Sequence, residues 1–199
     1  CAAQARTRTD SLALQQPRAP VLRQAVSVKA GMMWPVSRTG LTSFWSSGPS
    51  ASVSFHVAVN RYVSIGLGLE AAKFRFSRSR FLDAYPATIP QDDDIFWINV
   101  SVGGRLAFLP GMRTNPYVCA SIGASRLTEA LHRVIKEQER ITYYYVGGTT
   151  RLTGTLGVGA DIFFNRSLAV ELEVRGVGVH NDPDFAIGVS GQAGLRFAF

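Results

Sequence analysis

The chain has 199 residues, which fits a single domain, and hydrophobic residues make up 46% of it. They are spread along the chain, and no run reaches the roughly 18 consecutive apolar residues that a transmembrane helix needs. The formal charge is +7, but the 18 arginines are scattered rather than clustered, which argues against a nucleic-acid partner. Nineteen glycines and a scarcity of helix-forming stretches favour β structure.

The two cysteines, Cys1 and Cys119, exclude a disulfide framework and lack the spacing of a metal site. The first five residues (CAAQA) support two interpretations. Their last three residues have the A-x-A form of a cleavage site, which marks the end of a secretory signal peptide. Alternatively, Cys1 is the acylated first residue of a mature lipoprotein. Both interpretations imply export.

Residues 6–22 are polar, contain two prolines and have no periodicity, so they predict a flexible arm or leader. Beyond them, eight segments alternate apolar with small or polar residues, at the period of two that a β-strand produces. In chain order the segments cover residues 26–34, 51–59, 63–72, 96–108, 118–125, 152–164, 168–175 and 185–199.

The last segment alternates over fifteen residues, from Phe185 to Phe199. Strands average about five or six residues in globular proteins. A tilted membrane crossing takes roughly 9–11 residues. The length of this segment therefore favours a membrane-spanning strand.

The connections differ in length on the two sides. Asn60-Arg61 and Asn165-Arg166 predict tight turns, because Asn tolerates a positive φ, and residues 109–116 (LPGMRTNP) predict a short Gly/Pro turn. The other connections are mostly longer, at about 35–50, 77–93 and 127–149, with a shorter one at 180–184. Residues 125–145 either extend a hairpin above the membrane or form a short helix. Short periplasmic turns opposite longer extracellular loops are typical of outer-membrane barrels.

The face opposite the apolar one distinguishes a barrel in lipid from a soluble sheet. That face is rich in Gly, Ser and Ala and carries few long charged groups, which suits the crowded interior of a narrow barrel. The alternative is the solvated face of a soluble sheet. We predict an all-β, eight-stranded, antiparallel up-and-down transmembrane β-barrel over residues 24–199, preceded by a signal-peptide remnant or flexible periplasmic arm at 1–23.

The polar face carries four acids and four bases, with His56 as a further polar group. We predict that the eight charges form an ion-pair network in the lumen, because an unpaired buried charge is strongly destabilising. The residues are Lys29, Glu70, Arg105, Asp161, Glu171, Glu173, Arg175 and Arg196. Aromatic residues near the strand ends predict two interfacial girdles. They are Trp34, Trp97 and Tyr143–Tyr145 toward the loops, and Tyr62, Phe108, Phe164, Phe197 and Phe199 toward the turns.

The ending Gly194-Leu195-Arg196-Phe197-Ala198-Phe199 resembles the C-terminal strand of bacterial outer-membrane proteins. The resemblance implies that Leu195, Phe197 and Phe199 carry the signal that the barrel-assembly machinery recognises. Residues 24–199 resemble the small eight-stranded barrels of the OmpA, OmpX and OmpW type, which implies a location in the cell outer membrane. The implied partners are outer-membrane lipids, lipopolysaccharide, the assembly machinery, and a protein reached through the extracellular loops or the N-terminal arm.

For function, the sequence favours a structural or surface-interaction barrel without catalysis, cofactor or metal, because eight strands leave a lumen that side chains fill. A narrow channel for small or hydrophobic solutes is the alternative. A lipid A-modifying enzyme comes third: His180 lies near Asp182 and Asp184, but the His-x-Ser-Asn run of lipid A deacylases is absent.

Two charged segments of the loops are considered as sites for charged ligands. Arg75, Arg78 and Arg80 lie at the base of a loop, where they would meet lipopolysaccharide phosphates. The run Asp92–Asp94 predicts a solvated loop rather than a divalent cation site, because three adjacent side chains point in different directions.

Overall fold

Each alternating segment forms a strand of 11 to 15 residues in the computed structural model. The model describes residues 24–36, 45–84, 94–128, 130–135, 141–146, 148, 150–181 and 184–199. Within these residues the barrel strands are β1 (Gln24–Pro35), β3 (Gly48–Ala58), β4 (Val63–Phe76), β5 (Ile95–Ala107), β6 (Thr114–Leu127), β9 (Thr150–Phe163), β10 (Leu168–Asn181) and β11 (Asp184–Ala198).

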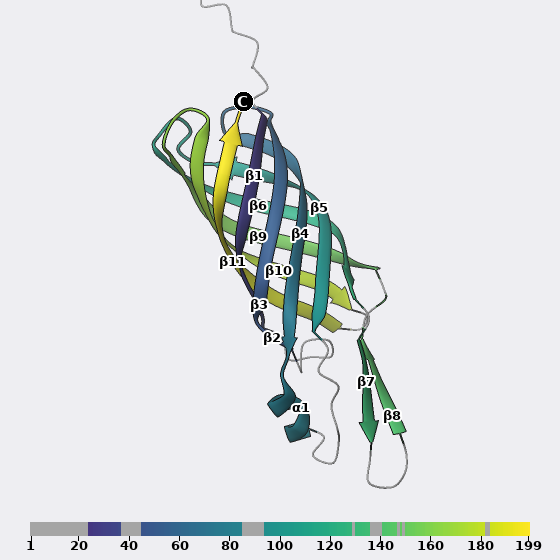
Figure 1. Cartoon of the computed structure of the whole chain (residues 1–199). Coiled ribbons are helices and arrows are strands. Elements are labelled where there is room, and N and C mark those ends of the chain that lie inside the picture. The colour runs from purple at the N-terminus through teal and green to yellow at the C-terminus, as the bar shows by residue number, and fades with distance from the viewer. Residues whose placement is uncertain are drawn as a thin grey trace, which may run out of the picture.

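Each barrel strand pairs antiparallel with the next one along the chain, and β1 pairs with β11 to close the barrel (Figure 1). At this seam Val28 lies opposite Leu195. The pairing continues beyond it to Gln24 and Phe199, which exchange backbone hydrogen bonds of 3.1 and 2.9 Å. The structure therefore confirms the predicted closed up-and-down barrel of eight strands.

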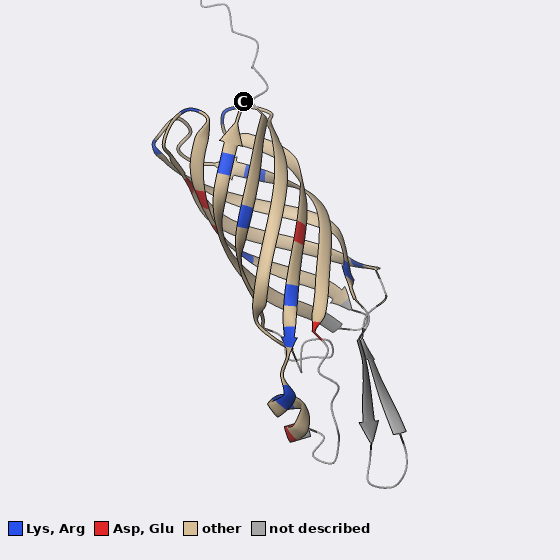
Figure 2. Cartoon of the chain, in the orientation of Figure 1, with Lys and Arg blue, Asp and Glu red and all other residues tan. Residues whose placement is uncertain are grey.

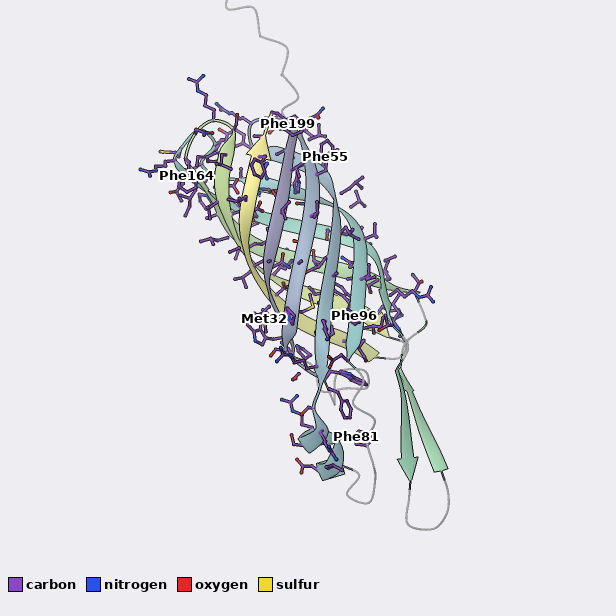
Figure 3. All side chains as sticks on the ribbon, viewed as in Figure 1. Met32, Phe55, Phe81, Phe96, Phe164 and Phe199 are labelled. Carbon is purple, nitrogen blue, oxygen red and sulfur yellow. The ribbon has the colours of Figure 1, made fainter. Side chains whose placement is uncertain are left out.

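The two faces of each strand differ as a barrel in lipid requires. Large apolar side chains face outward; Leu67 is 61% exposed and Leu156 is 70% exposed. Small polar side chains face inward, and Ser27 and Ser190 are fully buried. Figure 3 shows outward-facing apolar side chains at both ends of the barrel, including Phe55 near the C-terminal end. A water-soluble sheet would have the opposite arrangement.

Two of the short turns are built alike. The Asn60 side-chain oxygen accepts hydrogen bonds of 2.8 Å from the backbone amides of Tyr62 and Val63. Asn165 does the same for Ser167 and Leu168. This Asx geometry is the reason that Asn at the start of a two-residue connection predicts a turn. In the third turn Gly111 adopts a φ of 92°, a conformation that glycine accepts without strain.

The loop side differs from the prediction in two connections. In residues 127–149 the strands β7 (Ala130–Ile135) and β8 (Ile141–Val146) pair in a sheet of their own, so the helical alternative is wrong. The run ITYYYV is rich in β-branched and aromatic residues, whose strand preference outweighs the approximate helical spacing. The predicted loop at 180–184 is also shorter, because β10 and β11 stay paired as far as Asn181 and Asp184.

The remaining elements belong to the first two loops. The short strand β2 (Trp45–Ser46) pairs with the loop end of β4, and α1 (Arg78–Ala84) follows β4 (Figure 1). Phe81 of α1 is completely buried, with its ring 5.4 Å from that of Phe76. No helix among the described residues is long and apolar enough to cross a membrane.

The girdle prediction is right for the turn side and wrong for one loop-side residue. The predicted turn-side aromatics, from Tyr62 to Phe199, are 40% to 70% exposed, and Trp34 on the loop side is 44% exposed. Trp97, however, is 2% exposed and packs in the lumen against Met33, Ala72 and Val177. Trp97 occupies an inward position of β5, so the lumen itself is apolar at this end. The side chains of Tyr143–Tyr145 lie outside the described residues.

Substitution of Leu156 by Arg tests which face meets lipid. Leu156 lies at the middle of β9, so in bilayers L156R should lower the free energy of unfolding by about 2–4 kcal/mol. The matched change F164R lies at the interface and should cost about 0–1 kcal/mol. Urea unfolding in lipid vesicles measures both, and equal effects of the two substitutions would argue against the assigned outer surface.

Candidate functional site

The eight charged residues of the predicted network form one chain of ion pairs through the lumen. Read from end to end, the signs alternate. Each carboxylate lies beside a cation, and each internal member of the chain contacts a partner on either side. The order is Glu70, Arg175, Glu173, Lys29, Glu171, Arg105, Asp161 and Arg196.

The middle of the chain is held most tightly. The Lys29 ammonium lies 2.8 Å from a Glu173 oxygen and 3.3 Å from a Glu171 oxygen. Arg105 then pairs with both Glu171 and Asp161. The side chains of these five residues are no more than 4% exposed. Such burial is tolerated because every charge has at least one opposite charge in contact.

Strand alternation places these residues in the lumen. Glu171, Glu173 and Arg175 occupy successive inward positions of β10, so one strand supplies three members of the chain. Their cross-strand neighbours on β9 include Gly157 and Gly159, opposite Arg175 and Glu173. A Cβ on Gly157 would lie 2.7 Å from the Cβ of Arg175. The glycines of the inner face thus leave room for the long charged side chains.

Tyr117 is a member of the site that sequence reasoning missed. Its hydroxyl lies 2.7 Å from a Glu171 oxygen and 2.9 Å from a Glu173 oxygen, and it can donate to either. The Arg105 guanidinium stacks over its ring, 3.4 Å from the centroid. Gly159 lies opposite Tyr117 in the register, and a Cβ there would lie 2.4 Å from the Tyr117 ring. Tyr117 therefore links the two central carboxylates and screens them from one another.

Gln192 is the second residue that was missed. Its side-chain nitrogen donates to Glu70 at 2.9 Å and to Ser50 at 3.1 Å. Its oxygen accepts from the Ser52 hydroxyl at 2.7 Å and from Arg175 at 3.3 Å. Gln192 thus ties the Glu70 end of the chain to β3. Alternation alone places it on the inward face, but an uncharged side chain gave no reason to single it out.

Three cavities lie at different heights in the lumen. A cavity of about 540 Å³ opens at the turn side, and Arg105, Asp161 and Arg196 are among its walls. A cavity of about 60 Å³ lies beside Lys29 and Glu173 at mid-height. A third, also about 60 Å³, is lined by apolar residues at the loop end. The ion-pair chain lies between the first cavity and the third.

The other predicted residues do not join this site. The His56 ring nitrogen Nε2 lies 3.1 Å from the Ser54 hydroxyl and faces the mid-height cavity. His180 is exposed at the loop end of β10, while Asp182 lies outside the described residues. Leu195, Phe197 and Phe199 face outward at 43% to 70% exposure, and their role as an assembly signal stays a prediction.

The predicted loop charges lie outside the barrel. Arg75, Arg78 and Arg80 are exposed at the end of β4 and in α1. Asp94 forms an ion pair of 2.8 Å with Lys73, and this bond holds the pKa of the Asp94 carboxyl below its usual range. Asp92 and Asp93 lie outside the described residues, and the described part of the chain contains no cluster of metal-ligating side chains.

Substitution of Arg105 by Leu should be the most damaging change in the chain of charges. It removes two ion pairs and leaves Asp161 with only the 3.9 Å contact to Arg196, so we expect a loss of about 3–5 kcal/mol. R196L should cost less, because Asp161 keeps Arg105. The double variant R105L/D161L should recover part of the loss. Denaturant unfolding in detergent micelles measures all three, and a harmless R105L would refute the coupling.

No protein-family model matches the chain, and no curated protein matches it. Among solved structures, the Neisserial surface protein A superposes with a TM-score of 0.59 at 13% identity, covering 88% of this chain and 97% of that one. Ail of Yersinia pestis has a TM-score of 0.51 at 9% identity, covering 89% and 99%. OprG of Pseudomonas aeruginosa gives 0.51 at 9% identity, covering 89% and 96%. With its closed antiparallel barrel, the chain has the fold of the small eight-stranded outer-membrane β-barrels.

Proposed function

We propose that this protein is an integral outer-membrane barrel with a structural or surface-interaction role, and that side chains keep its lumen closed. The observation that carries the proposal is the alternating chain of charges between Glu70 and Arg196. None of its eight side chains is more than 14% exposed. A barrel of eight strands has an interior that side chains fill, and these side chains are bonded to one another.

Opening such a lumen would require the separation of buried ion pairs. Moving Arg175 aside, for example, would leave Glu70 with its Gln192 contact but without a cation, at a cost of several kcal/mol. The charges of the chain also sum to zero, with four acids and four bases. A selective pore would be expected to carry an excess of one sign along its length.

The exposed loop end is the surface that we assign to interaction. Buried Phe81 anchors α1 against Phe76, whose ring is 6.0 Å from that of Trp45. The anchored segment carries the exposed Arg78 and Arg80 outside the lipid-facing band. Figure 2 shows basic residues, in blue, on α1 beyond the end of the barrel. Arginine side chains in that position suit the phosphates of lipopolysaccharide in the outer leaflet.

Conductance in planar bilayers tests the closed lumen. The wild-type protein should give no discrete openings. The variant E70A/R175A removes two ion pairs, because Arg175 also contacts Glu173, together with two large side chains, and we expect it to conduct small ions. The matched control L69A shortens an adjacent side chain on the lipid face and should stay silent. Discrete wild-type openings would contradict the closed lumen.

A second function is favoured by the apolar cavity at the loop end. Its walls include Met33, Trp97, Leu127, Val177 and Val179. Trp97 is 2% exposed, yet none of the described residues forms a hydrogen bond with its indole nitrogen. Buried indole N–H groups usually find an acceptor. The cavity therefore suits a small apolar molecule that carries one hydrogen-bond acceptor, which is the chemistry of a barrel that binds or passes hydrophobic solutes.

A comparison of 2-hexanone with n-hexane tests this second function. The ketone can accept a hydrogen bond from Trp97 and should bind about fivefold more tightly than the alkane. In W97F the two should bind equally, and A186L, which fills the cavity, should bind neither. Indole ¹⁵N–¹H spectra of nanodisc-embedded protein report the titration, through Trp97 in the wild type and A186L and through Trp45, which also lines the cavity, in W97F. An unshifted Trp97 signal at saturating ketone would exclude the function.

A further inference from the structure

We propose that the turn-side cavity is a binding site for a phosphate group. With a volume of about 540 Å³, this cavity is larger than the other two described above, and it opens at the end of the barrel where Gln24 and Phe199 meet. Its walls include four arginines and one acid: Arg61, Arg105, Arg166, Arg196 and Asp161. Arg105, Asp161 and Arg196 belong to the electrically neutral chain of ion pairs, so Arg61 and Arg166 add two positive charges that the chain does not balance.

Arg196 is the residue that points to a ligand. It ends the alternating chain, and its ion pair is the longest of the chain, 3.9 Å from Nε to Asp161. The side chain is only 13% exposed, and its buried Nη1 has no hydrogen-bond partner among the described residues. A buried guanidinium nitrogen without an acceptor is costly, so a bound anion would supply what the protein does not.

Asp161 defines the anion more closely. One of its oxygens pairs with Arg105 and Arg196, while the other, Oδ1, is buried with no partner in the part of the chain that the structure describes. An oxygen of this kind can accept a hydrogen bond but repels a fully deprotonated anion. A phosphate group with a hydroxyl nearby satisfies both Arg196 and Asp161. Its charged oxygens accept hydrogen bonds from the Arg196 guanidinium, and the hydroxyl donates to Asp161. Monoprotonated phosphate and the glycerol phosphate of a lipid head group share this chemistry.

The rim of the cavity supports the same class of ligand. Arg61 and Arg166 follow the asparagines of the two matching Asx turns, so each turn presents one guanidinium at the mouth. Arg61 also lies over the Tyr62 ring, 4.6 Å from its centroid, which limits its freedom. No acid occurs in residues 59–62, 108–113 or 164–167, the three short turns of the barrel. Anions approaching this mouth therefore meet a positive field from every turn.

Titration of the whole chain in phosphatidylcholine nanodiscs with inorganic phosphate tests the site. Calorimetry should show one saturable site per chain. R196Q should weaken binding about tenfold or more, since it removes a charge-assisted bond in a buried position. R166Q should weaken it about two- to fivefold, as expected for an exposed arginine. The control R113Q removes an exposed turn arginine that does not line the cavity, and it should leave the affinity unchanged.

Nanodiscs that contain phosphatidylglycerol distinguish the two sources of phosphate. If the lipid head group fills the site, phosphate binding should be lost in these nanodiscs, and if free phosphate is the ligand, binding should persist. Circular dichroism of each variant checks that the barrel is folded. The proposal is overturned if wild-type protein shows no saturable phosphate binding, or if R113Q weakens binding as much as R196Q and R166Q do.

Discussion

Closure of the backbone hydrogen-bond ladder is the constraint on which the rest of this structure depends. In hydrocarbon no water is available to pair with a free sheet edge, so β1 must find β11 although the two lie at opposite ends of the chain. Closure then separates two environments by strand alternation alone. One face of every strand meets lipid tails, and the other is confined to a narrow lumen. Any charge placed on the inner face must be balanced within that lumen.

The eight charges of the lumen meet this requirement by pairing with one another in alternating sign, and Tyr117 and Gln192 add further hydrogen bonds to them. Some buried polar atoms still have no hydrogen-bond partner among the described residues. At the loop end this holds for the indole nitrogen of Trp97, and at the turn end for Nη1 of Arg196. Atoms of this kind also occur between the two ends, for example on Glu70 and His56. Trp97 and Arg196 differ from these because they line the cavities at the two ends of the lumen, which suits a closed barrel with a ligand site at each mouth.

Alternation predicted the strands, their inward and outward faces and the charged residues that the structure joins in the lumen. Tyr117 was left out because the predicted strand began at residue 118. Extending that strand toward the turn would have added two inward positions, Tyr117 and Asn115. Trp97 was assigned to a girdle because it is aromatic and near a strand end. The alternation of its segment nevertheless places that position on the inner face. The ion-pair partners and the cavities depend on how eight strands are staggered around a ring, which no single segment encodes. The strands β7 and β8 follow the strand propensity of their residues rather than the approximate helical spacing of this part of the sequence.

Fluorescence quenching by brominated lipid tails tests the inside-out arrangement most directly, because the chain contains three tryptophans. Trp34 faces outward at 44% exposure, whereas Trp45 and Trp97 are each 2% exposed. A W45F/W97F protein retains only Trp34, and a W34F/W45F protein retains only Trp97. In bilayers of brominated phosphatidylcholine the first should lose most of its emission and the second should keep it. Equal quenching of the two, or quenching of Trp97 alone, would contradict the assignment of the two faces.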